Sequence, residues 1–174
     1  MVINDDRLAT ISPPDQNWHG SESITFTAED TGGLSESVVA TFTVNPVNDP
    51  PIVTDIPSQT VNEDTPFTTI DLGSYVDDVD NPDNELTWSV SDIVDLTVSI
   101  DENHIATITP PNGEWYGSET LTFTAFDPNG LSDSDTATFR VIAVNDTPVV
   151  EDIPAQSISE GGSFTNINLD DFVF

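Results

Sequence analysis

The sequence of 174 residues contains no cysteine, no lysine and only two arginines. Without cysteine, a disulfide framework, a thiolate zinc site and thiol catalysis are all excluded. The two arginines stand against 32 aspartates and glutamates, which gives a formal net charge of -30. Phosphate binding needs clustered Lys and Arg, so the sequence predicts neither a nucleic acid nor an anionic membrane surface as a partner.

Long apolar runs are also missing. No stretch approaches the roughly 20 apolar residues that a membrane-spanning helix requires, so we predict no membrane insertion. The chain does not open with the basic and apolar segments of a signal peptide, and we expect any export signal to lie outside it.

What the sequence does contain is an internal repeat. Trp18 and Trp115, Asn48 and Asn145, and Glu63 and Glu160 are each 97 residues apart. Between residues 13–67 and 110–164, about half of the aligned positions are identical without a gap, and repeats of this length correspond to whole small β-domains. We therefore predict the C-terminal part of a first repeat (1–49), a complete repeat (50–146) and the N-terminal part of a third (147–174).

The local pattern within the complete repeat predicts strands only. Apolar residues and threonine alternate with period two at 121–125 and again at 137–141, which is typical of strands with one buried face. The other predicted strands are 52–56, 68–72, 86–90, 96–100 and 105–109. About seven short strands in some 100 residues predict an all-β fold, a Greek-key sandwich of the immunoglobulin type in each repeat.

The acidic residues gather at strand ends and repeat boundaries. Residues 76–84 contain four aspartates, Asp127 follows a predicted strand, and the sequence Val-Asn-Asp occurs at both 47–49 and 144–146. Two carboxylates about 5 Å apart repel by about 3 kcal/mol at an effective dielectric near 20. Calcium, which takes 6–8 oxygen ligands in a flexible geometry, suits such clusters better than magnesium. The alternative is a solvated surface adapted to salt.

These motifs resemble a known family. The linkers Val-Asn-Asp-x-Pro at 47–51 and 144–148 are similar to the interdomain linker of cadherins. The stretch Asp78-x-Asp80-x-x-x-Asn84 and the pair Ala125-x-Asp127 resemble further cadherin motifs. Together with Trp-x-Gly-Ser-Glu, they look most like the cadherin-like tandem repeats of large bacterial surface adhesins.

The resemblance implies calcium at both junctions. The first junction would draw on Glu22, Asn48, Asp49, Asp78, Asp80, Asn84 and Asp127. The second would draw on Glu63, Glu119, Asn145 and Asp146. Glu22 and Glu119 stand in for the glutamate of the cadherin Leu-Asp-Arg-Glu motif, which the sequence lacks, and Pro46 and Ala143 occupy the place of a further linker aspartate.

The predicted function is a non-catalytic structural or adhesive module. It would be one segment of an extracellular stalk or fibre whose partners are neighbouring repeats and a surface carbohydrate or protein receptor. The alternative is a carbohydrate-binding accessory domain of a secreted enzyme, with Tyr116, Tyr75 and Trp88 as its aromatic residues. An enzyme is disfavoured, because the acidic residues recur from repeat to repeat whereas an active site is unique.

Incomplete repeats at both ends suggest a further hypothesis. Residues 147–174 would supply the first strands of a sandwich and residues 1–49 the last ones. If the chain is a complete subunit, identical chains could then complete one another head to tail and form a filament. The simpler interpretation, which we favour, is a segment of a longer array of repeats.

Overall fold

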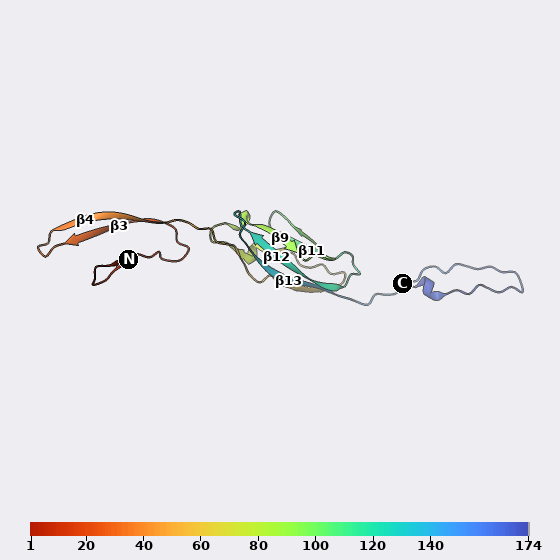
Figure 1. Ribbon diagram of the computed structural model, residues 1–174. Coiled ribbons are helices and arrows are strands. Elements are labelled where there is room, and N and C mark those ends of the chain that lie inside the picture. Colours follow the sequence, from red (N-terminus) through yellow and green to blue (C-terminus); the bar gives the residue numbers. More distant parts are fainter. Residues whose placement is uncertain (174) are drawn as a thin grey trace.

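A computed structural model describes residues 1–173, and its regular structure consists of strands and three short 3-10 helices. The chain is elongated, with a hairpin at one end, a sandwich in the middle and residues 147–173 at the other end (Figure 1). The strands are β1 (Val2–Ile3), β2 (Ala9–Thr10), β3 (Gly20–Glu29), β4 (Ser35–Val44), β5 (Ile52–Val53), β6 (Gln59–Asn62), β7 (Ile70–Asp71), β8 (Val76–Asp77), β9 (Thr87–Ser91), β10 (Thr97–Ile100), β11 (Ile105–Thr109), β12 (Gly117–Phe126) and β13 (Ser132–Ile142). The 3-10 helices are η1 (Leu72–Tyr75), η2 (Asp83–Glu85) and η3 (Leu169–Phe172).

The sandwich consists of two sheets. One sheet has the order β6-β13-β12-β9 and the other β10-β11-β7, while β5 and β8 form a separate pair. Strand β6 runs parallel to β13, whereas the remaining pairs are antiparallel. Two layers of short strands around one core confirm the predicted fold class.

The alternating pattern determines which face is buried. Leu121, Phe123 and Ala125 of β12 point into the core and the threonines between them point outwards. On β13, Phe139 packs edge-to-face against Phe67, with ring centroids 5.3 Å apart. Aromatic pairs of this geometry add about 0.5–1.5 kcal/mol beyond the area they bury.

The seven strands predicted from the sequence are all present; β11 has the predicted bounds and the other six differ. Strands β6 and β8 were missed. β6 was missed because Gln59–Asn62 is largely polar and sits at the edge of its sheet, and β8 because it has only two residues. Strands β12 and β13 extend well beyond the predicted five residues, since their polar ends still pair across the whole hairpin.

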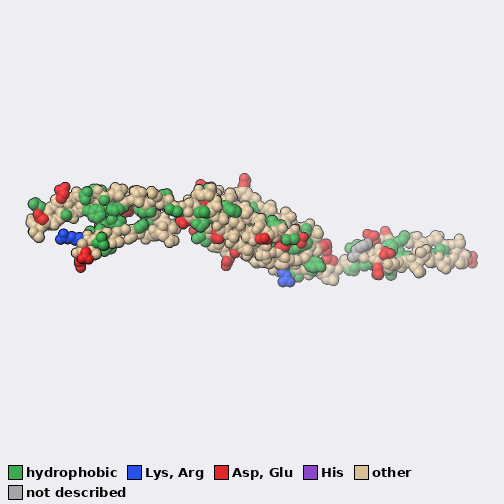
Figure 2. All heavy atoms as spheres, in the orientation of Figure 1, with side chains coloured by type: hydrophobic (Ala, Val, Ile, Leu, Met, Phe, Trp, Pro, Cys, Tyr) green, Lys and Arg blue, Asp and Glu red, His purple; other side chains and the backbone are tan. Residues whose placement is uncertain are grey.

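The two ends of the chain are built differently from the middle. Strands β3 and β4 form a hairpin and β1 pairs with β2, but in residues 1–173 every buried apolar side chain lies between Pro51 and Val141. Figure 2 shows hydrophobic side chains gathered at the surface of the hairpin. Residues 147–173 contain only η3 and a single bridge between Val150 and Val173.

Turn geometry recurs at the repeat distance. Arg7 and His104, 97 residues apart, both have φ near +60°, and Gly33 and Gly130 both have φ near +90°. Because non-glycine residues rarely adopt positive φ, the shared conformation of Arg7 and His104 reflects the same tight turn in both places. The bounds of the three predicted repeats remain a prediction.

Candidate functional site

Asp127 is the centre of the first junction. It follows β12 and opens the turn to β13, where one carboxylate oxygen accepts the backbone N–H groups of Asn129 (2.8 Å) and Leu131 (2.9 Å). The other oxygen accepts the side-chain amide of Asn48 at 2.6 Å, across 79 residues of sequence. The linker is therefore tied to the far end of the β12–β13 hairpin.

The buried Asp127 carboxylate stays ionised. Burial by itself raises its pKa, but the hydrogen bonds donated by Asn48, Leu131, Asn129 and Gly130 outweigh this effect and leave the pKa below its ordinary value. Hydrogen bonds to the charged form favour it in this way. The lowered pKa favours a negative charge on Asp127 at this junction.

The second half of the first junction is the turn after β8. The backbone N–H of Asp49 donates to Asp80 Oδ2 at 2.7 Å, and Asp78 Oδ1 accepts the N–H groups of Asp80 and Asn81 at 2.8 and 2.9 Å. Two oxygens here, Asp78 Oδ2 and Asn81 Oδ1, are buried and have no hydrogen-bond partner. Buried polar atoms are nearly always satisfied, so orphaned oxygens suggest a missing ligand, and a hard cation accepts this type of donor.

Five of the predicted residues are therefore brought together at the first junction, namely Asn48, Asp49, Asp78, Asp80 and Asp127. Two further residues join them that the sequence argument did not include: Asn81, through its orphaned oxygen, and Asn129, whose side-chain amide contacts Asn48 Oδ1. Neither residue occupies a position of the cadherin motifs on which the prediction relied.

Two predicted members lie apart from this group. Glu22 is exposed on β3, where it lines a hollow of the hairpin together with Trp18 and Phe42. Asn84 is exposed in η2. Within residues 1–173, no side-chain hydrogen bond joins either residue to the rest of the junction.

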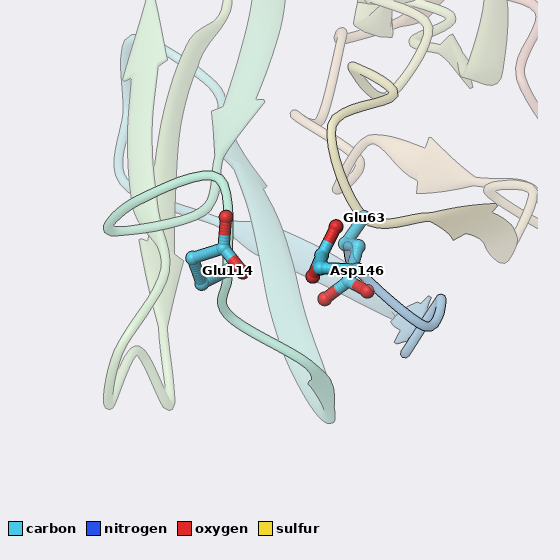
Figure 3. Close-up of side chains that lie close together, drawn as sticks. All are labelled: Glu63, Glu114 and Asp146. Carbon is cyan, nitrogen blue, oxygen red and sulfur yellow. The ribbon is translucent and has the colours of Figure 1, made fainter. Parts of the chain in front are cut away.

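The second junction gathers three carboxylates. Oxygen atoms of Glu63, Glu114 and Asp146 lie within 4.8 Å of one another (Figure 3). Glu63 follows β6, Glu114 belongs to the connection between β11 and β12, and Asp146 lies in the linker after β13. Three separate segments therefore supply one acidic cluster.

This cluster is electrostatically unfavourable as it stands. The charge of Asp146, a hydrogen bond with it, partial desolvation and the charges of Asp64 and Glu63 all raise the pKa of Glu114. Glu63 is buried, and one of its carboxylate oxygens accepts the backbone N–H of Val144. Like charges at this spacing repel unless a proton or a cation lies between them.

Glu119, predicted for this junction, is used elsewhere. Its carboxylate accepts the backbone N–H groups of Val94 (3.1 Å), Asp95 (2.7 Å) and Leu96 (3.0 Å), and so holds the connection from β9 to β10. The structure gathers Glu114 with Glu63 and Asp146 in its place.

Little in the sequence indicated Glu114, because the first repeat has Asn17 at the equivalent position. Asn145 donates its amide to the carbonyl of Asp146 at 3.1 Å, as Asn48 does to Asp49 at 3.1 Å. Both linkers thus carry the same local turn.

Asp133 and Asp135 hold the start of the sandwich. Asp133 accepts the N–H of Val53 at 2.8 Å and Asp135 that of Ile56 at 2.7 Å. Each carboxylate therefore binds a backbone donor near β5.

The aromatic residues considered for sugar binding are scattered. Tyr75, Trp88 and Trp115 pack against the core, and Trp115 Nε1 donates to Asp95 at 3.3 Å. Tyr116 is exposed. These side chains offer a carbohydrate one exposed ring rather than a platform.

Comparison with protein families identifies the family of this chain. The family of bacterial Ig domains matches residues 48–141, which is more than half of the sequence. The chain therefore belongs to this family. The comparison with curated proteins gives no match.

A solved structure supports the Ig-like and cadherin-like fold. The extracellular cadherin domains 1–4 of protocadherin gamma B7 are similar, with 22% identity and a TM-score of 0.53 over 82% of this chain and 37% of that one. A structure of PcdhgB3 EC1-4 matches with 19% identity and a TM-score of 0.49, over 72% of this chain and 32% of that one. An endo-fucoidan hydrolase from glycoside hydrolase family 107 matches with 23% identity and a TM-score of 0.44, over 73% of this chain and 19% of that one.

The chain is thus much shorter than the proteins to which it is similar. Among its described residues, no helix has the length and apolar character needed to pass through a lipid bilayer.

Proposed function

We propose that this chain is a non-catalytic segment of an extracellular stalk whose junctions bind calcium. The observation that carries the proposal is the meeting of Glu63, Glu114 and Asp146, from three segments, within 4.8 Å. With only two basic residues in the whole chain, a cation from solution is the available means of neutralising this cluster.

The donor chemistry favours calcium. All the groups offered at both junctions are oxygens of carboxylates, amides and the backbone, which hard cations prefer over nitrogen or sulfur. They come from separate loops and a linker, and calcium tolerates the irregular geometry that results, whereas magnesium requires a near-ideal octahedron.

Calcium would stiffen the chain because its ligands would tie each linker to the sandwich. At the first junction, Asn48 and Asp49 of the linker already contact Asp127 and Asp80 of the sandwich. A cation that binds Asp78 Oδ2 and Asn81 Oδ1 would add to these contacts. At the second junction, Asp146 of the linker would be bound to Glu63 and Glu114.

The site also supports a location outside the cell. Extracellular calcium modules bind with dissociation constants of about 10⁻⁴–10⁻³ M, which suits a partly exposed cluster such as this one. The partners of the chain would be its neighbouring repeats, and beyond them a surface receptor. Carbohydrate binding remains the second candidate, favoured only by the exposed ring of Tyr116.

Isothermal titration of the full chain with calcium tests the proposal. Glu114→Gln and Asp146→Asn should each weaken binding at the second junction about tenfold or more, because each removes a charged ligand. The matched control is Glu102→Gln, an exposed glutamate of the turn between β10 and β11, which should bind calcium like the parent chain. The absence of calcium binding, or unchanged binding in Glu114→Gln and Asp146→Asn, would overturn the proposal.

A further inference from the structure

Asparagine followed by glycine occurs twice in the sequence, at Asn112–Gly113 and at Asn129–Gly130, and proline precedes both pairs. Such a pair is reactive because glycine, which has no side chain, lets its backbone nitrogen approach the side chain of the asparagine. The local sequence is therefore the same at the two pairs. The structure, however, holds them very differently.

Asn129–Gly130 is held by hydrogen bonds on both of its reacting groups. The side-chain amide of Asn129 donates to Asn48 Oδ1, and its backbone N–H donates to Asp127 Oδ1 at 2.8 Å. The attacking nitrogen, that of Gly130, donates its hydrogen to the carbonyl of Asp127 at 3.1 Å. A reaction between Asn129 and Gly130 has to break these bonds first, so the fold protects this pair.

Asn112–Gly113 lacks this restraint. Both residues are exposed in the connection between β11 and β12. Within residues 1–173, the Asn112 side chain and the Gly113 N–H form no hydrogen bond, and the turn is closed by the Trp115 N–H, which donates to the Asn112 carbonyl at 3.4 Å. Position 113 also favours glycine, because a Cβ there would lie 2.5 Å from Asp64 Oδ1. Both reacting groups are therefore free to approach one another.

We propose that Asn112 is a site of spontaneous deamidation. The Gly113 nitrogen gives its proton to water and bonds to Cγ of Asn112, while Nδ2 takes up a proton and leaves as ammonia, which closes a succinimide ring. Water then opens the ring. Attack at Cγ gives aspartate at position 112, and attack at the backbone carbonyl carbon gives isoaspartate. The net reaction consumes one water and exchanges an amide for a carboxylate, with no oxidation or reduction.

The fold accepts the aspartate product. Position 112 is equivalent, at a distance of 97 residues, to Asp15, whose carboxylate accepts the backbone N–H of Asn17 at 3.0 Å. Aspartate at position 112 can form the same turn with the N–H of Glu114 as the donor. An aspartate carboxyl has an ordinary pKa of about 3.9, so the product is ionised at neutral pH.

The new charge would lie beside the second junction. Asn112 lines a hollow of about 370 Å³ together with Glu63 and Asp64. Deamidation therefore adds a carboxylate to a region that is already acidic. The modification would raise the affinity of this junction for a cation as the protein ages, a consequence that rests on the calcium binding proposed above.

Peptide mapping by mass spectrometry tests the modification apart from calcium. The folded full chain is kept in a chelator at mildly alkaline pH, and deamidation is followed at both pairs over time. Asn112 should react about tenfold faster than Asn129 or more, because hydrogen bonds must open before Asn129 can react. In denaturant, where these bonds are absent, the two rates should become similar. No deamidation at Asn112, or equal rates in the folded chain, would overturn the proposal.

Asn48→Ala tests whether the hydrogen bonds are what protects Asn129. The variant removes the acceptor of the Asn129 side-chain amide. Deamidation of Asn129 should then become several-fold faster, while Asn112 keeps the rate that it has in the parent chain. An unchanged rate at Asn129 would contradict the structural basis of the proposal.

Asn112→Asp reports the effect of the added charge on calcium. In a calcium titration it should bind a few-fold more tightly than the parent chain, because a carboxylate is added beside the acidic cluster. The matched control is Asn103→Asp, which adds the same charge in the exposed turn at the other end of β11 and should bind like the parent chain. Equal affinity of Asn112→Asp and the parent chain would overturn the charge effect. If neither binds calcium, the proposed function fails, whereas deamidation in the chelator still decides the modification.

Discussion

The acidic residues of the two junctions have different surroundings. At the first junction, Asp127 and Asp80 accept hydrogen bonds from amide and backbone N–H groups. At the second, Glu63, Glu114 and Asp146 face one another, and the pKa of Glu114 is raised as a result. Protein donors therefore compensate much of the charge at the first junction, whereas the second offers its three carboxylates few protein donors.

The strongest test of this contrast is Asp127→Ala. The change leaves the N–H groups of Asn129 and Leu131 and the amide of Asn48 without an acceptor. We expect the melting temperature to fall on the order of 10 °C, with or without calcium. The matched control is Asp30→Ala, since Asp30 forms the equivalent turn bonds to Gly32 and Leu34 but is exposed. An equal fall in melting temperature in both variants would show that Asp127 has no special role.

Replacing Glu114 by an uncharged residue should change the melting temperature in the opposite direction when calcium is absent. In a chelator, Glu114→Gln removes the repulsion between residue 114 and Asp146, so the melting temperature should rise by roughly a few degrees. In calcium it should fall below that of the parent chain, because a ligand is lost. Glu102→Gln should change neither value. A fall in the chelator would show that the three carboxylates are not in conflict.

The pH dependence of stability distinguishes Asp127 from Glu114. The folded pKa of Asp127 is lowered, so its stabilising effect is present above its ordinary pKa and is lost as pH falls through the lowered value. The folded pKa of Glu114 is raised, so the folded state gains stability as pH falls and loses it as pH rises through the raised value. Carbon NMR of the carboxyl groups should therefore show a lower pKa for Asp127 than for Glu114. Calcium should lower the pKa of Glu114, and an unchanged titration in calcium would contradict a role as ligand.

The smallest effect is expected at Glu119. Glu119→Gln should weaken the anchoring of Val94, Asp95 and Leu96 and raise hydrogen exchange at these three amides about tenfold. Calcium affinity should not change, because the carboxylate is engaged within the sandwich. A loss of calcium binding comparable to that of Glu114→Gln would show that Glu119 is a ligand at the second junction.

The sequence predicted the fold class because alternation on β12 and β13 is strong and their threonines contrast clearly with Phe123 and Phe139. It did not find β6, whose place depends on parallel pairing with a strand about 80 residues away. At the first junction, five of the seven predicted residues meet, since linker and turn motifs have fixed spacing. Glu114 was missed because its proximity to Glu63 and Asp146 arises from three loops and leaves no local pattern.

Thermal unfolding of the full chain in a chelator, in about 10 mM calcium and in about 10 mM magnesium at matched ionic strength tests the central claim most directly. With a dissociation constant of about 10⁻⁴ M, calcium at this concentration would stabilise the folded state by about 2.7 kcal/mol. The account predicts a rise in melting temperature on the order of 10 °C in calcium and a much smaller one in magnesium. Equal shifts in the two ions, or the same shift in sodium chloride alone, would contradict it and reduce the acidic clusters to a salt-adapted surface.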